Sequence, residues 1–327
     1  TKTLDGHTLI STNTTARSGT GFWDFNNGAT FVNNGVFTDT SSNDIRSFSG
    51  TNSMSNNGTY ILNAAGTRTL QVPITNLGNI DVQQGNLALS GLSSISPLNM
   101  VNQGTISVQS NQQLTLIDAN LTSAIGSITG AGILEIPSGS SLDVTGSTVD
   151  IANISLSGGT LLTNNMTYTG TLTWSAGTVD GTGLTTTGLA NVQDGVLNAT
   201  WNANGTTTVS GVLSGSGGIG VRSAASLTAS NEIGASVILN GGTLTANNLV
   251  LSNSFNWLSG SLNGSGLTTT ALATVQAVTL DIPWNAAGTT NISGDVTGSG
   301  SINIPVAAVL TANENTIATH VSLNGGT

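Results

Sequence analysis

Trp174-Ser-Ala-Gly-Thr-Val-Asp-Gly-Thr-Gly-Leu-Thr-Thr-Thr187 returns further along the chain as Trp257-Leu-Ser-Gly-Ser-Leu-Asn-Gly-Ser-Gly-Leu-Thr-Thr-Thr270, displaced by 83 positions. The two copies keep the tryptophan, the glycines and the leucine, and most of their differences are small. The match continues into Leu-Asn-Gly-Gly-Thr at 239–243 and again at 323–327, where one insertion has lengthened the period to 84. A fixed period of this kind is the signature of a chain built from stacked repeats.

A more diverged copy lies upstream, at about twice the period. Thr129-Gly-Ala-Gly-Ile-Leu-Glu-Ile-Pro137 aligns with Thr297-Gly-Ser-Gly-Ser-Ile-Asn-Ile-Pro305. We therefore expect an N-terminal part, residues 1–128, and a repeat-bearing part, residues 129–327, within one continuous solenoid. Because Thr327 aligns with Thr243 in the middle of a repeat, we also expect the chain to be part of a longer protein.

The composition excludes several classes of protein. Only 6% of the residues are charged, there is no cysteine, and the formal net charge is −10. Because so acidic a chain repels phosphate, nucleic acid is not an expected partner. No apolar stretch reaches the roughly 18 residues of a membrane-spanning helix, so no membrane span is predicted in this segment.

Short alternating runs predict strands and almost no helix. Asn-Ile-Asp-Val at 79–82 and Thr-Ile-Ser-Val at 105–108 place apolar residues at every second position, which is the period of a half-buried strand. Frequent Gly, Asn, Ser and β-branched residues disfavour helix throughout. The long repeat divides into four segments, each with its own turn signals. This pattern predicts an all-β, right-handed parallel β-helix with about 20 residues per coil; two-layer sandwiches in tandem are the competing fold.

A second motif marks the N-terminal part. Its four Asn-x-Gly-x-apolar copies begin at Asn33, Asn56, Asn76 and Asn102, and these intervals are again near one per coil. Asn and Gly tolerate the left-handed backbone conformation, so we expect a sharp corner at each copy. Asparagines stacked on successive coils could also bond to one another in ladders.

The Gly-Thr-Leu and Asn-x-Gly-x-apolar rhythm resembles the β-helical shafts of filamentous haemagglutinin-type and autotransporter adhesins of bacteria. The resemblance extends over nearly the whole chain, but it is one of rhythm and contains no motif specific for a chemistry. It implies an exported surface protein whose shaft presents or spaces a binding region.

The alternative for a β-helix is a carbohydrate-active enzyme, which needs two carboxylates on neighbouring coils. Three pairs could be placed in this way: Asp24 with Asp44, Glu135 with Asp150, and Asp180 with Asp194. The internal copies argue against a catalytic role, because they replace carboxylates with neutral residues. Asn263 stands for Asp180, Ala277 for Asp194, Asn303 for Glu135, and Asn198 for Asp281. We therefore predict no catalytic residues and no enzyme activity.

Other motifs that could bind a cofactor or metal are weak. Gly215-Ser-Gly-Gly-Ile-Gly220 matches the dinucleotide fingerprint literally, but no helix is expected after it, so we interpret it as a coil corner. His7 and His320 lie at opposite ends of the chain, and no calcium-loop motif occurs. No cofactor and no metal site is predicted.

Five tryptophans in a chain with 4% aromatic residues invite a role as sugar-stacking platforms. They are Trp23, Trp174, Trp201, Trp257 and Trp284. The last four occupy equivalent places in two copies, as residues that fill the interior of a wide coil would. Packing is the favoured interpretation, and glycan contact is the alternative.

The sequence thus favours a non-enzymatic, extracellular structural shaft, a segment of a large cell-surface adhesin or fibre. Its possible partners are other copies of itself, end to end or side by side, and cell-surface glycans or receptors. A polysaccharide-binding or polysaccharide-cleaving β-helix is the second hypothesis. Its groove would lie near Trp23 or between Trp174 and Trp201.

Overall fold

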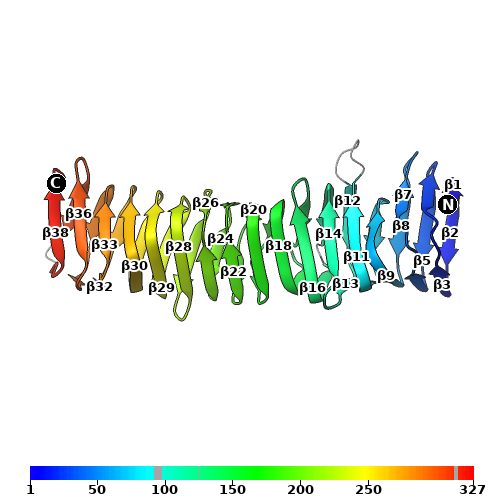
Figure 1. Cartoon of the computed structure of the whole chain (residues 1–327), viewed down its shortest axis with the longest axis horizontal. Helices are drawn as coiled ribbons and strands as arrows, with labels where there is room; N and C mark the ends of the chain where they lie inside the picture. The colour runs from blue at the N-terminus through cyan, green and yellow to red at the C-terminus, as the bar shows by residue number, and fades with distance from the viewer. Residues whose placement is uncertain (92–97, 124, 313–315) are drawn as a thin grey trace. The chain divides into compact units, whose positions relative to one another are not determined.

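The computed structural model describes residues 1–91, 98–123, 125–312 and 316–327. These residues contain strands, turns and bends but no helix, and the fold is a parallel β-solenoid with about 16 turns of roughly 19 residues. The all-β, parallel-coil prediction is confirmed. The chain divides into two compact units, Thr1–Met166 (unit 1) and Thr167–Thr327 (unit 2). Each unit is described by itself below (Figure 1).

Every turn of unit 1 crosses three parallel ladders of strands. Ladder 1a contains β1 (Lys2–Asp5), β4 (Trp23–Asn26), β7 (Ile45–Ser47), β14 (Gln113–Ile117), the later parts of β9 (Thr59–Leu70), β11 (Asn79–Ser90) and β16 (Ser127–Pro137), and the middle of β18 (Thr148–Thr163). Ladder 1b contains β2 (Thr8–Ser11), β5 (Thr30–Asn33), β8 (Ser53–Asn56), β10 (Ile74–Asn76), β12 (Leu98–Asn102), β15 (Ala119–Thr122), β17 (Ser141–Asp143) and the end of β18. Ladder 1c contains β3 (Thr14–Arg17), β6 (Val36–Asp39), β13 (Thr105–Val108) and the starts of β9, β11, β16 and β18.

Unit 2 repeats this three-ladder plan. Ladder 2a contains β21 (Leu184–Thr186), β24 (Thr200–Ala203), β27 (Gly218–Arg222), the starts of β29 (Ser236–Leu251) and β30 (Phe255–Thr269), β31 (Ala273–Val275), β34 (Thr289–Ile292) and β37 (Val309–Ala312). Ladder 2b contains the starts of β20 (Thr171–Gly181) and β28 (Ser226–Ile233), β22 (Leu189–Val192), β25 (Thr206–Val209), the middles of β29 and β30, β32 (Val278–Thr279) and β35 (Val296–Thr297). Ladder 2c contains the ends of β20, β28, β29 and β30, β23 (Gly195–Leu197), β26 (Val212–Ser214), β33 (Pro283–Ala286), β36 (Ser301–Pro305) and β38 (His320–Asn324). The remaining strand, β19 (Met166–Tyr168), lies at the boundary between the units.

The ladders of unit 1 continue across residue 129, where the repeat-bearing part of the sequence begins. β16 contains Thr129 to Pro137 and pairs with β13 and β14 before it and with β18 after it, all within unit 1. The predicted division between 128 and 129 is one of sequence pattern and concerns no compact unit. The division into compact units falls between residues 166 and 167.

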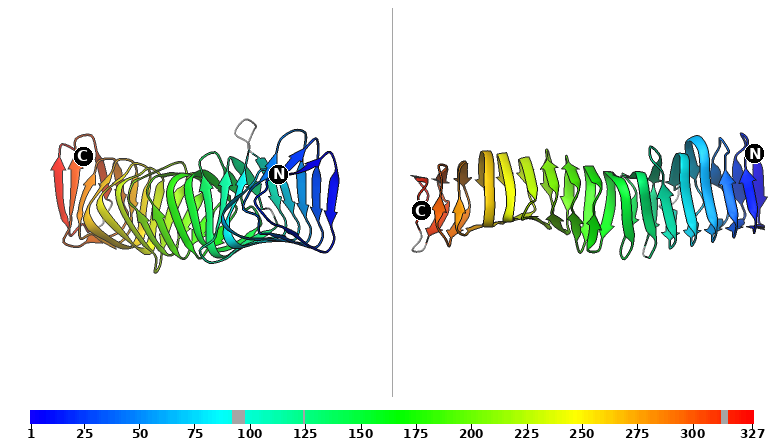
Figure 2. Two further views of the ribbon diagram at one scale, coloured as in Figure 1. Left: turned by 45° about the vertical axis from the view of Figure 1, so that its right-hand side comes forward. Right: turned by 90° about the horizontal axis from the view of Figure 1, so that it is seen from below.

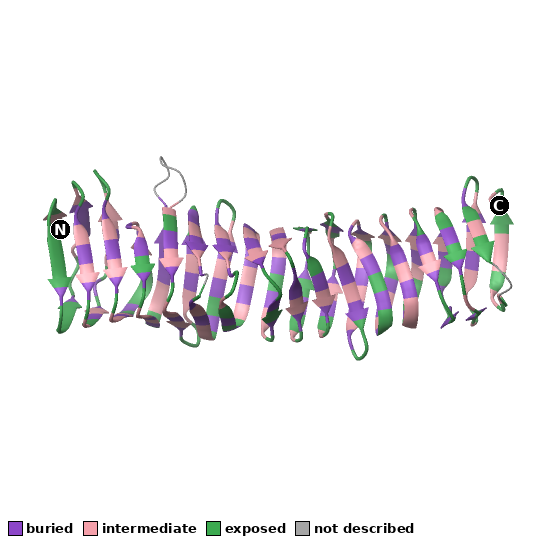
Figure 3. Ribbon diagram, turned by 180° about the vertical axis from the view of Figure 1, so that it is seen from behind, coloured by how far each residue is buried: buried purple, intermediate pink, exposed green. Residues whose placement is uncertain are grey.

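Alternating burial explains why these short runs form strands. In β13 and β25, for example, successive residues alternate between outward and buried positions, as the period of a strand requires. Figure 3 shows the same banding of buried and less buried residues along the strands. Strands of neighbouring turns run in the same direction within each unit (Figure 2). The core of each unit is therefore made of stacked aliphatic rows.

The Asn-x-Gly corners have a different cause from the one expected. Asn33, Asn56, Asn76 and Asn102 do not have positive φ, and neither do the glycines two positions later. The glycine is needed because neighbouring turns approach closely: a Cβ on Gly58 would lie 2.1 Å from the carbonyl oxygen of Gly35. No side chain fits in that space. The left-handed corner proposed for this motif is therefore wrong.

The predicted asparagine ladder is confirmed. Asn33 donates from Nδ2 to Oδ1 of Asn56 at 2.7 Å, Asn56 donates to Asn76 at 2.7 Å, and Asn76 donates to Asn102 at 2.8 Å. All four are at most 1% exposed. Each amide also donates to a backbone carbonyl, which for Asn56 is that of Asn79 at 2.8 Å. The motif thus unites a buried amide column with a backbone contact that only glycine permits.

The long repeat does not span a whole number of turns. Following ladder 2b from Trp174, four turns pass through Val192, Val209 and Ala229 and arrive at Ala246. From Ala246 the chain next passes through a strand of ladder 2c and then enters ladder 2a, where Trp257 lies. The repeat therefore covers four full turns and two further ladders. The whole-number division into four coils is therefore wrong, because paired positions of successive turns are mostly 17 or 18 apart here. Equivalent residues of the two copies stand on different ladders.

Candidate functional site

Trp174 and Trp257, the first tryptophans of each copy, are both 0% exposed. Their indole N–H groups make the same local bond. Trp174 Nε1 donates to the carbonyl oxygen of Gly177 at 3.2 Å, and Trp257 Nε1 donates to that of Gly260 at 3.4 Å. The indole thus satisfies its one donor inside the core. No face of either ring is open to a sugar.

The second pair of tryptophans follows the same rule. Trp201 is 0% and Trp284 is 1% exposed. Trp201 Nε1 donates to Oγ1 of Thr186 at 2.9 Å, and Trp284 Nε1 donates to Oγ1 of Thr269 at 3.0 Å. Both threonines are buried and lie at the same distance along the chain before their tryptophan. Burial and identical partners in two copies support packing, not glycan contact, for these four indoles.

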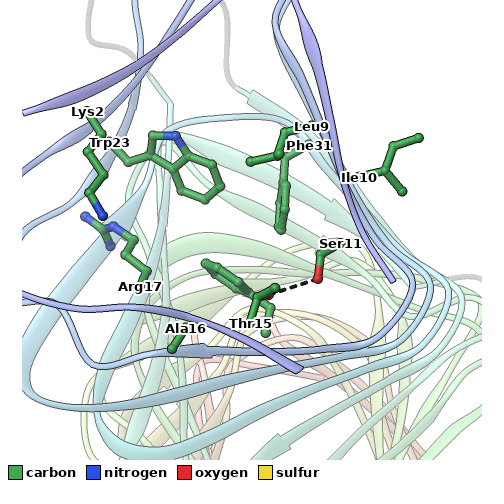
Figure 4. Close-up of a pocket in the computed structure, with 10 residues that line it drawn as sticks. Lys2, Leu9, Ile10, Ser11, Thr15, Ala16, Arg17, Trp23 and Phe31 are labelled. Atoms are coloured by element: carbon green, nitrogen blue, oxygen red, sulfur yellow. Dashed lines mark hydrogen bonds between the residues drawn. The ribbon is translucent and has the colours of Figure 1, made fainter. Parts of the chain in front are cut away.

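Trp23 lies in a different environment. It is 8% exposed and belongs to an aromatic cluster in unit 1 with Phe25, Phe31 and Phe37, whose rings have centroids 5.0–5.8 Å from the indole. It lines a cavity of about 220 Å³. The other lining residues are Lys2, Leu9, Ile10, Ser11, Thr15, Ala16, Arg17, Phe31 and Phe37. Figure 4 shows the indole and the Phe31 ring beside this cavity, which is mainly apolar and contains no carboxylate.

A charged group lies in the core of unit 1. The Asp39 carboxylate is 0% exposed and accepts hydrogen bonds from Arg17 Nη1 at 2.7 Å, from the Tyr60 hydroxyl at 3.2 Å and from the backbone N–H of Ser41 at 3.0 Å. Burial, and then the Asp39 charge, raise the pKa of Tyr60 well above its ordinary value. The phenol therefore stays protonated and keeps donating. This set of contacts stabilises the coil, and of its side chains only Arg17 lines the cavity beside Trp23.

Arg68 is the second buried cation of unit 1. It is 4% exposed, and its guanidinium donates to the carbonyl oxygens of Ser42 at 2.8 Å, Thr67 at 2.9 Å and Ala65 at 3.1 Å. Its Nε has no hydrogen-bond partner. Since carbonyls of two successive turns accept its other donors, Arg68 holds the bend of β9 against the turn before it.

The first candidate carboxylate pair, Asp24 and Asp44, is engaged in structural contacts. Asp24 accepts two hydrogen bonds from Arg46, Nε to Oδ1 at 2.8 Å and Nη2 to Oδ2 at 2.9 Å. The guanidinium also lies over the Phe22 ring, 3.7 Å from its centroid. Asp44 accepts from the backbone N–H of Thr69 at 2.8 Å. Both carboxylates therefore hold neighbouring turns together.

The second pair is divided between ladders. Glu135 lies in the 1a part of β16 and accepts a hydrogen bond from Gln113 in the preceding turn. Asp150 lies in the 1c part of β18, opposite Thr129. The sequence suggested that these two carboxylates could meet, and the structure does not bring them to the same ladder.

The repeat explains the carboxylates of unit 2. Asp281 Oδ1 accepts from Ser299 twice, from N at 2.9 Å and from Oγ at 3.1 Å. Its counterpart Asn198 accepts the same two bonds from Ser216, at 3.3 and 3.4 Å. Because an amide oxygen makes the same contacts, the carboxylate charge is not required at this position.

Asp180 and Asp194, the third candidate pair, accept hydrogen bonds from different backbone N–H groups. Asp180 Oδ1 accepts from the backbone N–H of Gly181 at 2.7 Å, and Asp194 Oδ1 accepts from that of Val212 at 2.8 Å. Asp180 is half-buried and Asp194 is exposed. Asp194 thus joins successive turns in the same way as Asp281, whereas this contact of Asp180 lies within its own bend.

The two histidines belong to different units. His7 hydrogen-bonds through Nδ1 to the carbonyl oxygen of Asp5, and His320 begins β38. Both are exposed. Among the described residues, no group of three or more His, Cys, Asp or Glu side chains is placed to hold a metal ion.

Two shallow hollows of unit 2 are copies of each other. One is lined by Ala176, Gly177, Thr178, Asp194, Gly195, Val196, Val212 and Ser214, and the other by Ser259, Gly260, Ala277, Val278, Thr279, Asp295 and Thr297. Each has a volume of about 350 Å³. Every residue of the second hollow is the counterpart of one in the first, but Ala277 stands for Asp194 and Asp295 stands for Val212. The shape of the hollow therefore follows from the fold, whereas the position of the carboxylate differs between the two copies.

A third hollow lies in the first copy of the repeat, and we call it the β27 groove. It has a volume of about 240 Å³ and lies over ladder 2a. Its lining residues are Thr200, Asn202, Gly218, Ile219, Gly220, Arg222, Ile238 and Asn240. It is the strongest candidate for a site in unit 2, because it unites an open surface, two amides and an arginine.

Sequence reasoning missed this groove because it treated Gly215 to Gly220 as one corner. Gly215 and Gly217 do lie at the corner, where a Cβ would come within 2.1 and 2.2 Å of carbonyl oxygens. Gly218 and Gly220 belong instead to β27 and occupy its outward positions. The signal was available in the repeat, since Ser301 and Asn303 replace Gly218 and Gly220 in the second copy.

Comparison with known proteins adds no relative. No protein-family model matches the chain, and neither does any curated protein or solved structure. Within the described residues, no helix is long and apolar enough to cross a membrane.

Proposed function

We propose that this chain is a segment of an extracellular structural shaft, part of a large adhesin or surface fibre, and that it is not an enzyme. Its role is mechanical, because the stacked turns hold other parts of the protein at a distance and so display them. The observation that carries the proposal is which residues the two copies of the repeat share. Two copies keep the buried indoles with identical hydrogen bonds, whereas charges such as Asp281 give way to Asn198.

The arrangement of the repeat also supports this role. Because one repeat covers four turns and two further ladders, each copy presents its equivalent residues on a different ladder from the copy before it. An enzyme needs its groups on one surface, close together. A shaft needs only a continued core, which any of the three ladders can supply.

Deletion of one repeat tests the shaft. Removal of residues 174–256 joins Thr173 to Trp257, so that Trp257 takes the place of Trp174. We expect unit 2 to keep its fold and to lose between four and five turns, which shortens it by roughly 22 Å at the ~4.8 Å spacing of paired strands. Electron cryomicroscopy of the whole chain measures the change.

A second deletion, which leaves one more residue in place, is the matched control. Removal of residues 174–255 places Asn256 at the buried position and turns Trp257 outward, because strand side chains alternate. This variant should unfold unit 2. If both deletions unfold unit 2, or if neither does, the repeat is not an interchangeable structural element and the shaft proposal fails. Antibodies against unit 2 that do not label intact cells would exclude the extracellular location.

A further inference from the structure

The glycines of the β27 groove are not required by the backbone. Neither Gly218 nor Gly220 has a positive φ. A Cβ on Gly218 would meet its nearest neighbour, the Ser236 carbonyl oxygen, at 3.5 Å, and a Cβ on Gly220 would meet Asn202 Oδ1 at 3.4 Å. Both are ordinary contacts. Since glycine weakens a strand interior, another reason is needed for two of them in β27.

The second copy shows what happens when the same place is filled. There Asn303 replaces Gly220 and donates from Nδ2 to Oδ1 of Asn285 at 2.9 Å, while Asn324 donates to Asn303 at 2.5 Å. Three amides thus close the surface across three turns. The counterparts of these three residues in the first copy are Asn202, Gly220 and Asn240, so Gly220 leaves the middle of the column open.

Arg222 completes the difference between the copies. It is exposed, lies at the end of β27 and is the only lysine or arginine after Arg68 in the sequence. Its guanidinium makes no ion pair within the described part of the chain, whereas Arg17 and Arg46 bind carboxylates. The second copy has Pro305 at this position. An unengaged cation beside an open groove favours an anionic ligand.

We propose that the β27 groove binds a carboxylated sugar unit, such as a uronate residue within an acidic glycan. The carboxylate would pair with Arg222, whose planar guanidinium suits two-point binding. The amides of Asn202 and Asn240 can both donate to and accept from sugar hydroxyls. The glycine floor and Ile238 offer a flat, partly apolar surface to a sugar ring. The volume of about 240 Å³ is below the roughly 300 Å³ at which sites for drug-sized molecules begin, which suits one such unit.

An acidic peptide fits the groove less well. β27 is paired on both sides, with β24 and with β29, so its backbone groups are used within the ladder. A peptide therefore cannot add itself as another strand, which is the usual source of main-chain affinity. The inference concerns an additional binding site and holds whether or not the chain is a shaft.

Binding of a hexauronate to the whole chain, measured by isothermal titration calorimetry, tests the proposal. Arg222→Met removes the cation, and Gly220→Asn fills the groove with the residue that folds at this place in the second copy. Each should weaken binding at least tenfold. Gly266→Asn is the matched control, because the nearest neighbour of a Cβ there is Asn248 Oδ1 at 3.5 Å, outside the groove. It should change the affinity less than twofold, as should Asn303→Gly, which opens the second copy without an arginine.

Four results would overturn the proposal. They are the absence of hexauronate binding, unchanged affinity in Arg222→Met, equal affinity for the methyl-esterified hexamer, which lacks the charge, and tighter binding of hexaglutamate, which would identify a peptide ligand. Circular dichroism of each variant confirms that it keeps its β-structure.

Discussion

Unit 1 and unit 2 wind the same three-ladder coil with different interiors. Residues paired between strands of successive turns are 19–27 positions apart in unit 1 and 17–20 positions apart in unit 2. The wider turns of unit 1 enclose an aromatic cluster, an asparagine column and a buried ion pair between Arg17 and Asp39. The buried polar residues of unit 2 in the described chain are four threonines. They are Thr186, Thr207, Thr269 and Thr290.

This difference shows two ways of fixing a solenoid turn. In unit 1, polar groups of one turn bond to those of the next, so that each depends on a partner that is distant in the chain. In unit 2, aliphatic rows and indoles fill the turn, and the buried threonine hydroxyls either bond to an indole or have no partner. Removal of a buried polar group should therefore destabilise unit 1, because it leaves a buried partner unpaired. In unit 2 the same change should stabilise the fold where the hydroxyl has no partner, as at Thr207 and Thr290.

The largest effect is expected from Asp39→Ala in unit 1. It leaves the buried Arg17 without its carboxylate and removes an acceptor from Tyr60, which should destabilise the surrounding turns by about 3–5 kcal/mol. Hydrogen exchange followed by mass spectrometry measures the loss of protection in β3, β6 and β9. Local exchange is the right observable because repeat proteins open in parts.

Asp281→Asn is the control for that experiment. It copies the natural residue Asn198 and should leave protection in unit 2 unchanged. Unchanged protection around Asp39 in the alanine variant would show that the buried ion pair does not hold unit 1 together.

A smaller effect is expected from Asn56→Ala. The variant breaks the asparagine column in its middle, orphaning an acceptor on Asn76 and a donor on Asn33, at a cost of about 2 kcal/mol. Asn57→Ala, which removes an exposed amide pair with Asn34, should cost less than half as much. Exchange rates in β8 and β10 distinguish the two, and equal effects would mean that the column adds nothing beyond a surface contact.

The smallest effect has the opposite sign and belongs to unit 2. The hydroxyls of Thr207 and Thr290, which are equivalent in the two copies, are buried and have no hydrogen-bond partner. Valine keeps their shape and removes the unpaired oxygen, so Thr207→Val and Thr290→Val should each stabilise unit 2 by about 1 kcal/mol. Chemical denaturation measures the gain.

Thr186→Val is the contrasting variant. Its hydroxyl accepts the Trp201 indole N–H, so valine at this position should destabilise unit 2. Stabilisation by all three valine variants would show that the indole bond contributes nothing, and the distinction between paired and unpaired threonines would not hold.

Particular residues show which features of the fold could be predicted from the sequence. The alternation in 79–82 and 105–108 correctly located strands, because burial on one face imposes a period of two on any strand. Stacking of Asn33, Asn56, Asn76 and Asn102 also followed from their spacing of about one turn. The role of the glycines after them did not, because the close approach of two backbones depends on a neighbour in the previous turn. The β27 groove was missed for another reason: Gly218 and Gly220 were assigned to the corner at Gly215, although the second copy has Ser301 and Asn303 in their places.

The sequence by itself determined the strands, the asparagine column and the existence of the long repeat. These depend on which residues alternate and which recur along the chain. Only the tertiary structure decided which ladder each copy occupies, because that depends on how much chain each closed turn consumes. Paired positions in unit 2 are mostly 17 or 18 apart, and neither interval divides the repeat evenly, so the second copy stands two ladders beyond a whole number of turns.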